Sequence, residues 1–267
     1  MQMQNNKNNI TNNFFEILIN KNLLDLANKQ DFQVGTKITD TKIISLKNLI
    51  FLSQKQTNSC DYIKIILDKN ININLLDDLL ESLTENSDLN NLAGRKIEIT
   101  LQENSFINYF FKKTCATTKS ELNEKEIIFK FIGQNSQAKA FCIIRENKNK
   151  VFNIKTIQDH QASFTKSDLT INAVLCQNST LLCDNIICVP KFVKKIEAKQ
   201  VNRNLLLSTD SRVISKPKLE IESDDVDCRH GAAMSRLDSE QLFFLQSRGL
   251  SYCQAKKTLI NAFLSCE

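Results

Sequence analysis

Glycine, proline and histidine are scarce in this chain, and tryptophan is absent. The 267 residues include 5 glycines, 2 prolines and 2 histidines. Tight two-residue hairpins usually require glycine at a positive φ, and the sequence contains no Asn-Gly or Asp-Gly pair. Strands in this chain must therefore be joined by wider connections, which favours a coil of parallel strands over an antiparallel meander.

Long apolar runs are also missing. No stretch approaches the roughly 20 residues that a helix needs to cross a bilayer. The opening MQMQNNKNNITNNFF contains neither the apolar block of a secretory signal nor the Arg-rich pattern of a mitochondrial presequence. Its first twelve residues are Asn-rich and are predicted to be disordered. We therefore expect a cytoplasmic protein without a membrane segment.

The formal net charge of +5 comes from charges that are spread along the chain. Segments such as VKKIEAK mix lysine with apolar residues, and no basic stretch combines with aromatic side chains into a surface for nucleic acid. We therefore expect no nucleic-acid partner. The G-x-x-x-x-G-K-[ST] loop of ATP-binding proteins is absent, so we expect no ATP site in this chain.

The nine cysteines include no C-x-x-C pair, and their number is odd. Without a secretory signal, this argues against a disulfide framework. Cys176, Cys183 and Cys188 form C-x6-C-x4-C, a spacing that matches no common zinc or ferredoxin site. Each lies in an apolar stretch, so these three thiols are predicted to be packed in the core.

The pattern of apolar residues divides the chain into three regions. Residues 1–94 should contain the disordered start, a helix over 14–29, strands over 42–54 and 61–70, and a helix over 73–86. Residues 95–236 contain short β-like runs separated by polar turns. Crossovers of helical length are missing there, which argues against a doubly wound α/β fold. A sandwich, a barrel or a β-helix remains. The scarcity of glycine favours the β-helix, although no fixed repeat period is visible.

The last region, residues 237–267, reads as two helices. Asp238 can cap the first, with Gln241 three residues on and Gly249 after the last turn. Ser251 can cap the second, with Gln254 at the matching position. An apolar stripe includes Leu259 and Phe263. This αα-hairpin can be a docking element for a partner, a lid over the open end of the β core, or both.

The stretch DDVDCRHGAA brings together the candidate site residues, Cys228 and His230. Ser223–Asp225 is predicted to be a corner, because the apolar positions before it are odd-numbered and those after it are even-numbered. Cys228 and His230 then share one strand face about 6–7 Å apart. That separation is too wide for a nucleophile–base pair in a hydrolase, but it suits two ligands of a metal whose remaining ligands come from elsewhere. The alternatives are a surface histidine beside a packed thiol, and a stand-alone metal-binding or redox-sensing module.

Four ordered blocks in the second half of the chain carry a resemblance to a known family: FNIKTIQDHQASFTKSDL, NRNLLLS, PKLEIESDDVDCRHGAAMSRLDSEQLFFLQSRGL and AKKTLINAF. The segment from about Val151 to Phe263 resembles the C-terminal core of the SufB/SufD family of iron–sulfur cluster assembly proteins, and within it the SufD members. The blocks cover about two-fifths of the chain. Residues 1–94 differ from the helical N-terminal region of that family and look shortened and diverged.

This resemblance implies a mainly β fold, with a right-handed parallel β-helix core, a shortened α/β N-terminal region and a C-terminal helical hairpin. It implies a scaffold subunit rather than an enzyme, which pairs with SufB through the β-helix end and with the SufC ATPase through the C-terminal helices. It also implies that iron or a nascent iron–sulfur cluster is shared with SufB. His230 would help to hold it, with Cys228 as an accessory thiolate or a neighbour. His160 falls in a matching block, and we expect it to tie a corner by hydrogen bonds rather than to bind metal.

Overall fold

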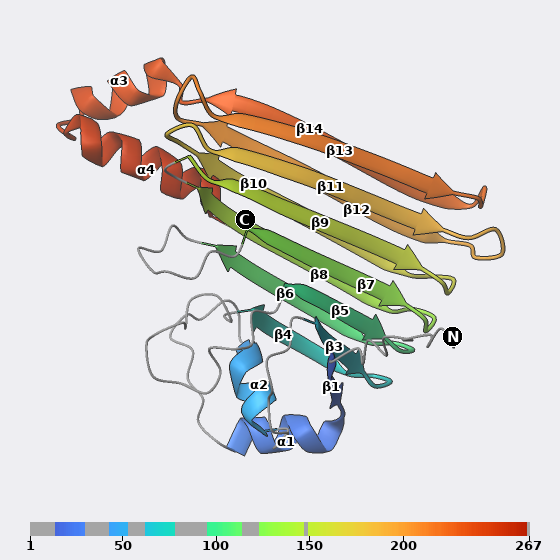
Figure 1. Ribbon diagram of the computed structural model, residues 1–267. Helices are drawn as coiled ribbons and strands as arrows, with labels where there is room; N and C mark the ends of the chain where they lie inside the picture. Colours follow the sequence, from blue (N-terminus) through green and yellow to red (C-terminus); the bar gives the residue numbers. More distant parts are fainter. Residues whose placement is uncertain are drawn as a thin grey trace, which may run out of the picture.

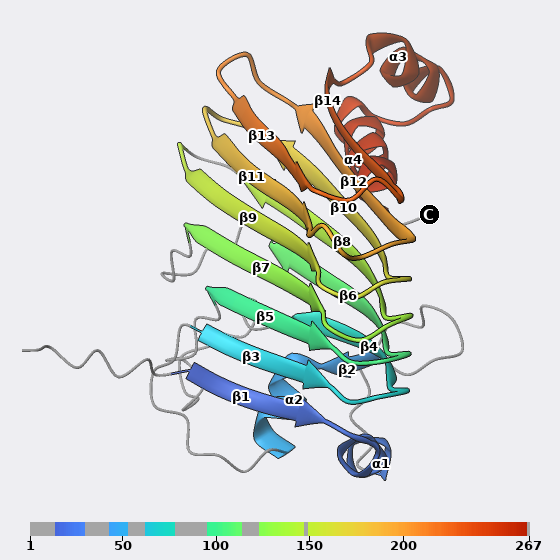
Figure 2. The ribbon, with the colours of Figure 1, turned by 90° about the vertical axis from the view of Figure 1, so that its right-hand side faces the viewer.

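In the computed structural model, the chain coils into a parallel β-solenoid built from two sheets of seven strands each (Figures 1 and 2). The structure describes residues 14–29, 43–52, 62–77, 95–113, 123–146 and 149–265. Consecutive strands alternate between the sheets, and neighbours within each sheet are parallel. The mainly β fold predicted from the sequence is therefore confirmed, with its parallel strands and its C-terminal pair of helices.

The odd-numbered strands form the first sheet and the even-numbered strands form the second. The first sheet contains β1 (Phe14–Ile19), β3 (Tyr62–Leu67), β5 (Lys96–Leu101), β7 (Glu124–Phe131), β9 (Val151–His160), β11 (Thr180–Val189) and β13 (Arg212–Ile221). The second contains β2 (Ile43–Ser45), β4 (Asn72–Asp77), β6 (Phe106–Lys113), β8 (Gln137–Glu146), β10 (Lys166–Leu175), β12 (Ile196–Leu206) and β14 (Val226–Arg236). The helices are α1 (Lys21–Lys29), α2 (Leu46–Leu52), α3 (Ser239–Ser247) and α4 (Tyr252–Leu264).

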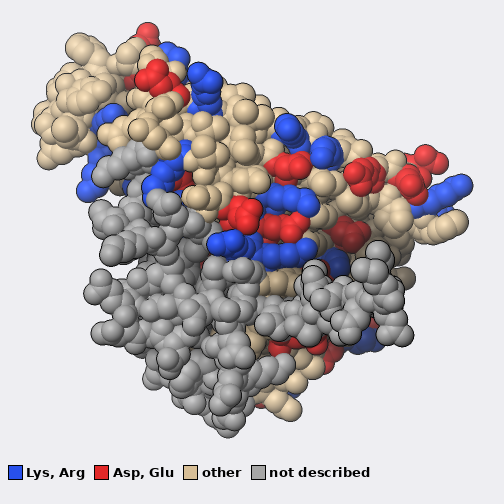
Figure 3. Space-filling model, in the orientation of Figure 1, with Lys and Arg blue, Asp and Glu red and all other residues tan. Residues whose placement is uncertain are grey.

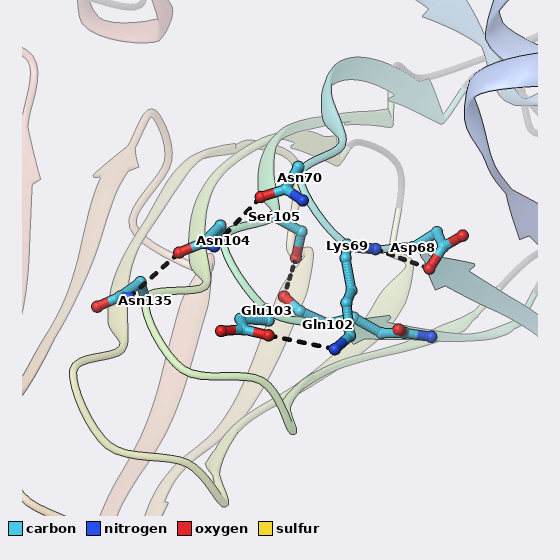
Figure 4. Close-up of polar contacts among 8 residues, drawn as sticks. All are labelled: Asp68, Lys69, Asn70, Gln102, Glu103, Asn104, Ser105 and Asn135. Carbon is cyan, nitrogen blue, oxygen red and sulfur yellow. Dashed lines mark hydrogen bonds and ion pairs between the residues drawn. The ribbon is translucent and has the colours of Figure 1, made fainter.

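Asparagine takes the place of glycine at the corners of the solenoid. Asn70, Asn104 and Asn135 lie at equivalent corners with φ angles of 58°, 54° and 58°. The Asn104 amide donates to the Asn70 side chain and the Asn135 amide donates to the Asn104 side chain, each over 3.2 Å (Figure 4). Asparagine tolerates this left-handed conformation better than most residues, which explains how a solenoid forms from so few glycines.

Strand alternation fills the space between the sheets with buried side chains. In β11, for example, every second residue from Leu181 to Val189 is buried, and the residues between them are half-buried. At the N-terminal end, Leu46, Leu49 and Ile50 of α2 pack into the same core at 0–2% exposure. This end of the core is therefore covered by a helix.

Charged side chains on the outer face of the first sheet alternate in sign from one strand to the next. Glu126 of β7 forms ion pairs with Lys96 of β5 (3.1 Å) and Lys155 of β9 (2.9 Å). Figure 3 shows these signs interleaved over the middle of the molecule. Opposite charges on adjacent strands favour this register, because a shifted register would bring like charges together.

Three expectations for the N-terminal region were wrong in part. The helix expected over 14–29 begins only at Lys21, because Phe14–Ile19 pairs with β3 as a strand. Most of the strand expected over 42–54 is helical, since β2 ends at Ser45 and α2 follows. Of the helix expected over 73–86, residues 73–77 form part of the strand β4 instead. Residues 78–86 lie outside the described part of the chain. The strand expected over 61–70 is confirmed by β3. In β1 and β4 a short apolar run became a strand because it pairs with a neighbouring strand, whereas in α2 the apolar residues pack into the core from a helix.

The domain boundary that we drew at residue 95 stays a prediction. Strands on both sides of it, β3 and β5, are paired in register within one sheet.

The two C-terminal helices have the predicted caps. Ser251 and Gln254 form a reciprocal capping box, and Gly249 has the left-handed φ of 94° that ends the turn after α3. Asp238 caps α3 by accepting a hydrogen bond from the Glu240 amide, but the predicted pairing with Gln241 is not among its described contacts. The lid interpretation was wrong, because α4 packs through Leu264 against Val174 and Leu205 of the second sheet. Figure 2 shows this helix pair beside that sheet rather than over the last strands.

Candidate functional site

The C-terminal end of the solenoid is open. β13 and β14 are the last strands of their sheets, and each has a strand neighbour on one side only among the described residues. The inward-facing positions of β14 are partly or fully exposed, because no further turn of the coil covers them (Figure 2). This end therefore differs from the N-terminal end, where α2 covers the core.

Cys228 and His230 both lie on the inward row of β14 at this open end. Their Cα partners in β12 are Ala198 and Gln200, which are buried between the sheets. The prediction that the two residues share one strand face is thus confirmed, as is the corner before β14, because β13 ends at Ile221 and β14 begins at Val226. Arg229, between them, lies on the opposite face and forms two 2.8 Å hydrogen bonds with Asp227.

The surroundings of Cys228 and His230 differ. Cys228 is partly buried and packs against an apolar cluster that includes Ile196 and Ala198. Burial raises the pKa of the Cys228 thiol, and the charge of Asp227 raises it further. His230, by contrast, is exposed. The imidazole is thus accessible at the open end, whereas the environment of the thiol favours its protonated form.

His160 ties a corner, as predicted. It is fully buried at the end of β9, and its two ring nitrogens lie 2.7 Å from the Thr165 hydroxyl and 2.9 Å from the Ser167 hydroxyl. Burial lowers its pKa to about 3, so the ring is neutral at physiological pH. Its hydrogen bonds stay within the corner between β9 and β10.

The three cysteines of the C-x6-C-x4-C pattern do not converge on one site. Cys183 is buried in the core, as predicted, and burial raises its pKa to about 12. Cys188 lies on the outward face of β11, where its thiol is 3.6 Å from a Glu220 carboxylate oxygen, and Cys176 is half-buried beside the Glu146 carbonyl. The prediction that all three thiols pack in the core is therefore confirmed for Cys183. It was wrong for Cys176 and Cys188, which are only partly buried.

Sequence reasoning missed a row of polar residues just inside the open end. Gln200, Asn202 and Asn204 occupy alternate inward positions of β12, and each is at most 2% exposed. Their signal is the amide at every second position in QVNRN, within a stretch that was otherwise interpreted by its apolar residues. Within the described part of the chain, no group of three His, Cys, Asp or Glu residues could hold a metal ion.

The sequence of this chain matches a known protein family over a region that includes the open end. The family model described as SUF system FeS cluster assembly, SufBD core domain, matches residues 108–263, which is more than half of the chain. The chain belongs to the SufB/SufD family. The match begins in β6 and ends in α4, so it includes Cys228, His230 and both C-terminal helices.

Curated relatives match shorter stretches. The chain is 33% identical to the iron–sulfur cluster assembly protein SufD of Escherichia coli over 131 residues, which are 49% of this chain and 31% of that protein. It is 44% identical over 77 residues to the SufBD family protein slr0076 of Synechocystis, covering 29% and 17% of the two chains. It is 42% identical over 80 residues to the chloroplastic protein ABCI7 of Arabidopsis thaliana, covering 30% and 17%. The chain thus spans less than a third of the length of these family members. None of the helices that the structure describes is long and apolar enough to span a membrane.

Proposed function

We propose that this chain is a SufD-like scaffold subunit of an iron–sulfur cluster assembly complex, and that it acts in the cytoplasm without catalysing a reaction itself. Its partner would be a protein of the SufB branch, which docks on the open solenoid end and completes a shared site for iron or a nascent cluster. The observation that carries the proposal is the exposed His230 on the inward row of the last strand, in a chain of this family.

The open end has the features of a docking surface. Unpaired edges of β13 and β14 offer backbone hydrogen bonds that strands of a partner can extend. Apolar side chains accompany them, since Ile214, Leu219 and Met234 are 47%, 41% and 58% exposed. A free protein gains by covering such a combination of open edges and apolar side chains.

The C-terminal helices offer a second surface. None of the residues of α3 is buried, and Phe243 and Phe244 are 72% and 55% exposed. Figure 3 shows this part of the molecule as largely uncharged. We assign α3 and α4 to docking of a SufC-type ATPase. Such a protein would supply the ATP hydrolysis for which this sequence has no phosphate-binding loop.

His230 would bind iron through a neutral imidazole nitrogen, a ligand that suits iron. Cys228 would be an accessory thiolate only while metal is bound, because its pKa is raised in the free chain. A stand-alone metal-binding or redox-sensing module is less well supported. The described residues contain no complete ligand set, and a thiol with a raised pKa reacts slowly with oxidants.

The test is anaerobic co-purification of the full chain with its SufB and SufC partners from the same genome, followed by iron and sulfide analysis. His230→Ala should leave the complex intact and lower its iron content at least several-fold, because the shared site loses an imidazole ligand. Phe192→Ala is the matched control, since this side chain is 89% exposed at a corner on the β11–β12 connection. An intact His230→Ala complex with wild-type iron would remove His230 as a ligand, and failure to form any complex would contradict the scaffold role.

A further inference from the structure

The strand next to the last one, β12, carries a row of inward-facing amide side chains. Gln200, Asn202 and Asn204 are the Cα partners of His230, Ala232 and Met234, the inward residues of the last strand. The deeper positions in the column of Gln200 are Leu169, Ala140, Tyr109 and Leu75, which are mainly apolar. Polarity in this column therefore begins at the turn of the coil that adjoins His230.

The carbonyl oxygen of each amide lacks a hydrogen-bond partner among the described residues. The Asn202 amide nitrogen donates to the Ser215 hydroxyl over 3.4 Å, and the Asn204 amide nitrogen donates to the Ala233 carbonyl over 3.2 Å. Buried carbonyl groups in folded proteins are nearly always satisfied, because an unsatisfied one is destabilising. Three in succession on one strand, next to the open end, make this row a candidate for binding a ligand.

The residue of the last strand that covers the middle of this row is small. Above Asn202 the last strand carries only the methyl group of Ala232. Amide oxygens are hard ligands for divalent cations, and an imidazole adds a nitrogen ligand that suits iron. A site of neutral ligands does not cancel the charge of the ion, so it would hold the ion loosely enough to pass it on.

We propose that Gln200 and Asn202 donate amide oxygens to a ferrous ion beside His230. The inference rests on the proposed function, because it takes His230 as an iron ligand. The ion stays ferrous throughout. Binding exchanges coordinated water for the two amide oxygens and the imidazole nitrogen, and transfer reverses that exchange.

The experiment is anaerobic equilibrium dialysis of the full chain against ferrous ammonium sulfate, for wild type, Gln200→Met, Asn202→Leu and His230→Ala. Each of the first two variants removes a carbonyl oxygen at nearly constant side-chain volume. We expect their affinity for Fe²⁺ to fall by about 10–100-fold, the range seen when groups around a metal site are removed. Asn202→Asp should bind Fe²⁺ more tightly than wild type, since it places a charged oxygen at the same position. A residue that only fills space would not produce that gain.

Asn172→Leu is the matched control. Asn172 is also a buried amide in a strand, at 2% exposure with an unpartnered carbonyl oxygen. It lies beneath α4, where its amide nitrogen donates to the Phe263 carbonyl over 3.1 Å. Its replacement should leave Fe²⁺ affinity unchanged. Circular dichroism of every metal-free variant verifies that the solenoid is folded.

The outcomes separate the inference from the proposed function. Weaker binding in Gln200→Met and Asn202→Leu, with Asn172→Leu unchanged, supports the amide site. If His230→Ala weakens binding and both amide variants match wild type, the amide site is overturned, the row holds water, and the proposed function stands. If His230→Ala also matches wild type, or if wild type binds no Fe²⁺, the inference is overturned. In that case the iron content of the full complex decides the proposed function independently.

Discussion

His160 illustrates a residue whose burial determines its chemistry. Its ring stacks on Phe131 at a centroid distance of 4.3 Å, and both ring nitrogens contact hydroxyl groups. A protonated ring would carry a charge into a fully buried position, and for that reason the pKa is lowered to about 3. The unfolded chain has no such restriction, and its histidines titrate near the ordinary value of about 6.5.

This difference predicts a loss of stability in acid. Between pH 6.5 and about 3 the unfolded chain takes up a proton at this position while the folded chain does not, so stability falls as the pH falls. The contribution is about 1.4 kcal/mol per pH unit. Urea unfolding of wild type and His160→Gln at pH 7.5, 6.0 and 5.0 measures it. Above pH 7 the two proteins differ by packing and by the two hydrogen bonds of the His160 ring, and the stability advantage of wild type should shrink with acidification. A constant offset would show that His160 is not the titrating group.

At this scale, alternation along a strand predicted that Cys228 and His230 share a face, since a period of two requires only local geometry. A role for the amides of β12 was not predicted, because their position next to the open end depends on which strand pairs with β12. That the row lies next to the last strand follows from the pairing of Gln200 with His230. Pairing between strands about 30 residues apart was not visible in the sequence.

Among the elements, the corners set how the solenoid turns. Four successive connections place Asn70, Asn104, Asn135 and Phe164 in the left-handed region. Asparagine accepts that conformation, whereas a bulky residue such as phenylalanine is strained there. Phe164 is nonetheless 51% exposed and has φ of 62°. The corner between β9 and β10 is thus less stable than the corners that carry asparagine.

Opposite substitutions at two corners test this account. Asn104→Ala should lower the free energy of unfolding by about 1–2 kcal/mol, because it places an ordinary residue in the left-handed region and removes both amide contacts. Phe164→Asn should raise it by about 0.5–1 kcal/mol, since it relieves strain at an exposed position. Denaturant unfolding measures both. Destabilisation by Phe164→Asn would mean that the aromatic ring contributes contacts that outweigh the strain.

Sequence patterns predicted most of the strands from β5 onward, where alternating residues and polar corners recur without helical crossovers, but they did not single out β6. They failed in the N-terminal region, because short apolar runs such as Phe14–Ile19 suit a helix or a strand equally well. There the choice was made by parallel pairing with β3. The repeat period also stayed hidden. Aligned residues on neighbouring strands are 34 apart between Tyr62 and Lys96 but 29 apart between Glu126 and Lys155.

On the scale of the whole molecule, the two ends of the solenoid are unequal. One end is covered by α2, and the other exposes unpaired strand edges beside His230. α3 has no buried residues and projects beyond the ends of the last strands (Figure 1). A repeat fold normally needs a polar cap at each terminus, so the open end is the terminus that we propose a partner covers.

Two separate surfaces predict that binding to the two partners can be abolished one at a time. Met234→Lys puts a charge on the inward row of β14 and should prevent co-purification of the SufB-type partner, since a charge buried at a strand interface is strongly unfavourable. Phe243→Lys puts a charge on the most exposed aromatic residue of α3 and should prevent co-purification of the SufC-type ATPase. Both residues are exposed in the free chain, so each change should alter its stability by no more than about 0.5 kcal/mol.

Reciprocal pull-downs with a tag on this chain measure both interactions in one preparation. Each single variant should retain the partner that the other variant loses, and the double variant should lose both. If Met234→Lys released both partners while its unfolding curve matched wild type, the two surfaces would be one, and docking of the ATPase would depend on the open end. If Met234→Lys retained the SufB-type partner, the strand edges beside His230 would not be the interface. The iron site would then have to be completed within this chain, where the amides of β12 are the nearest additional ligands.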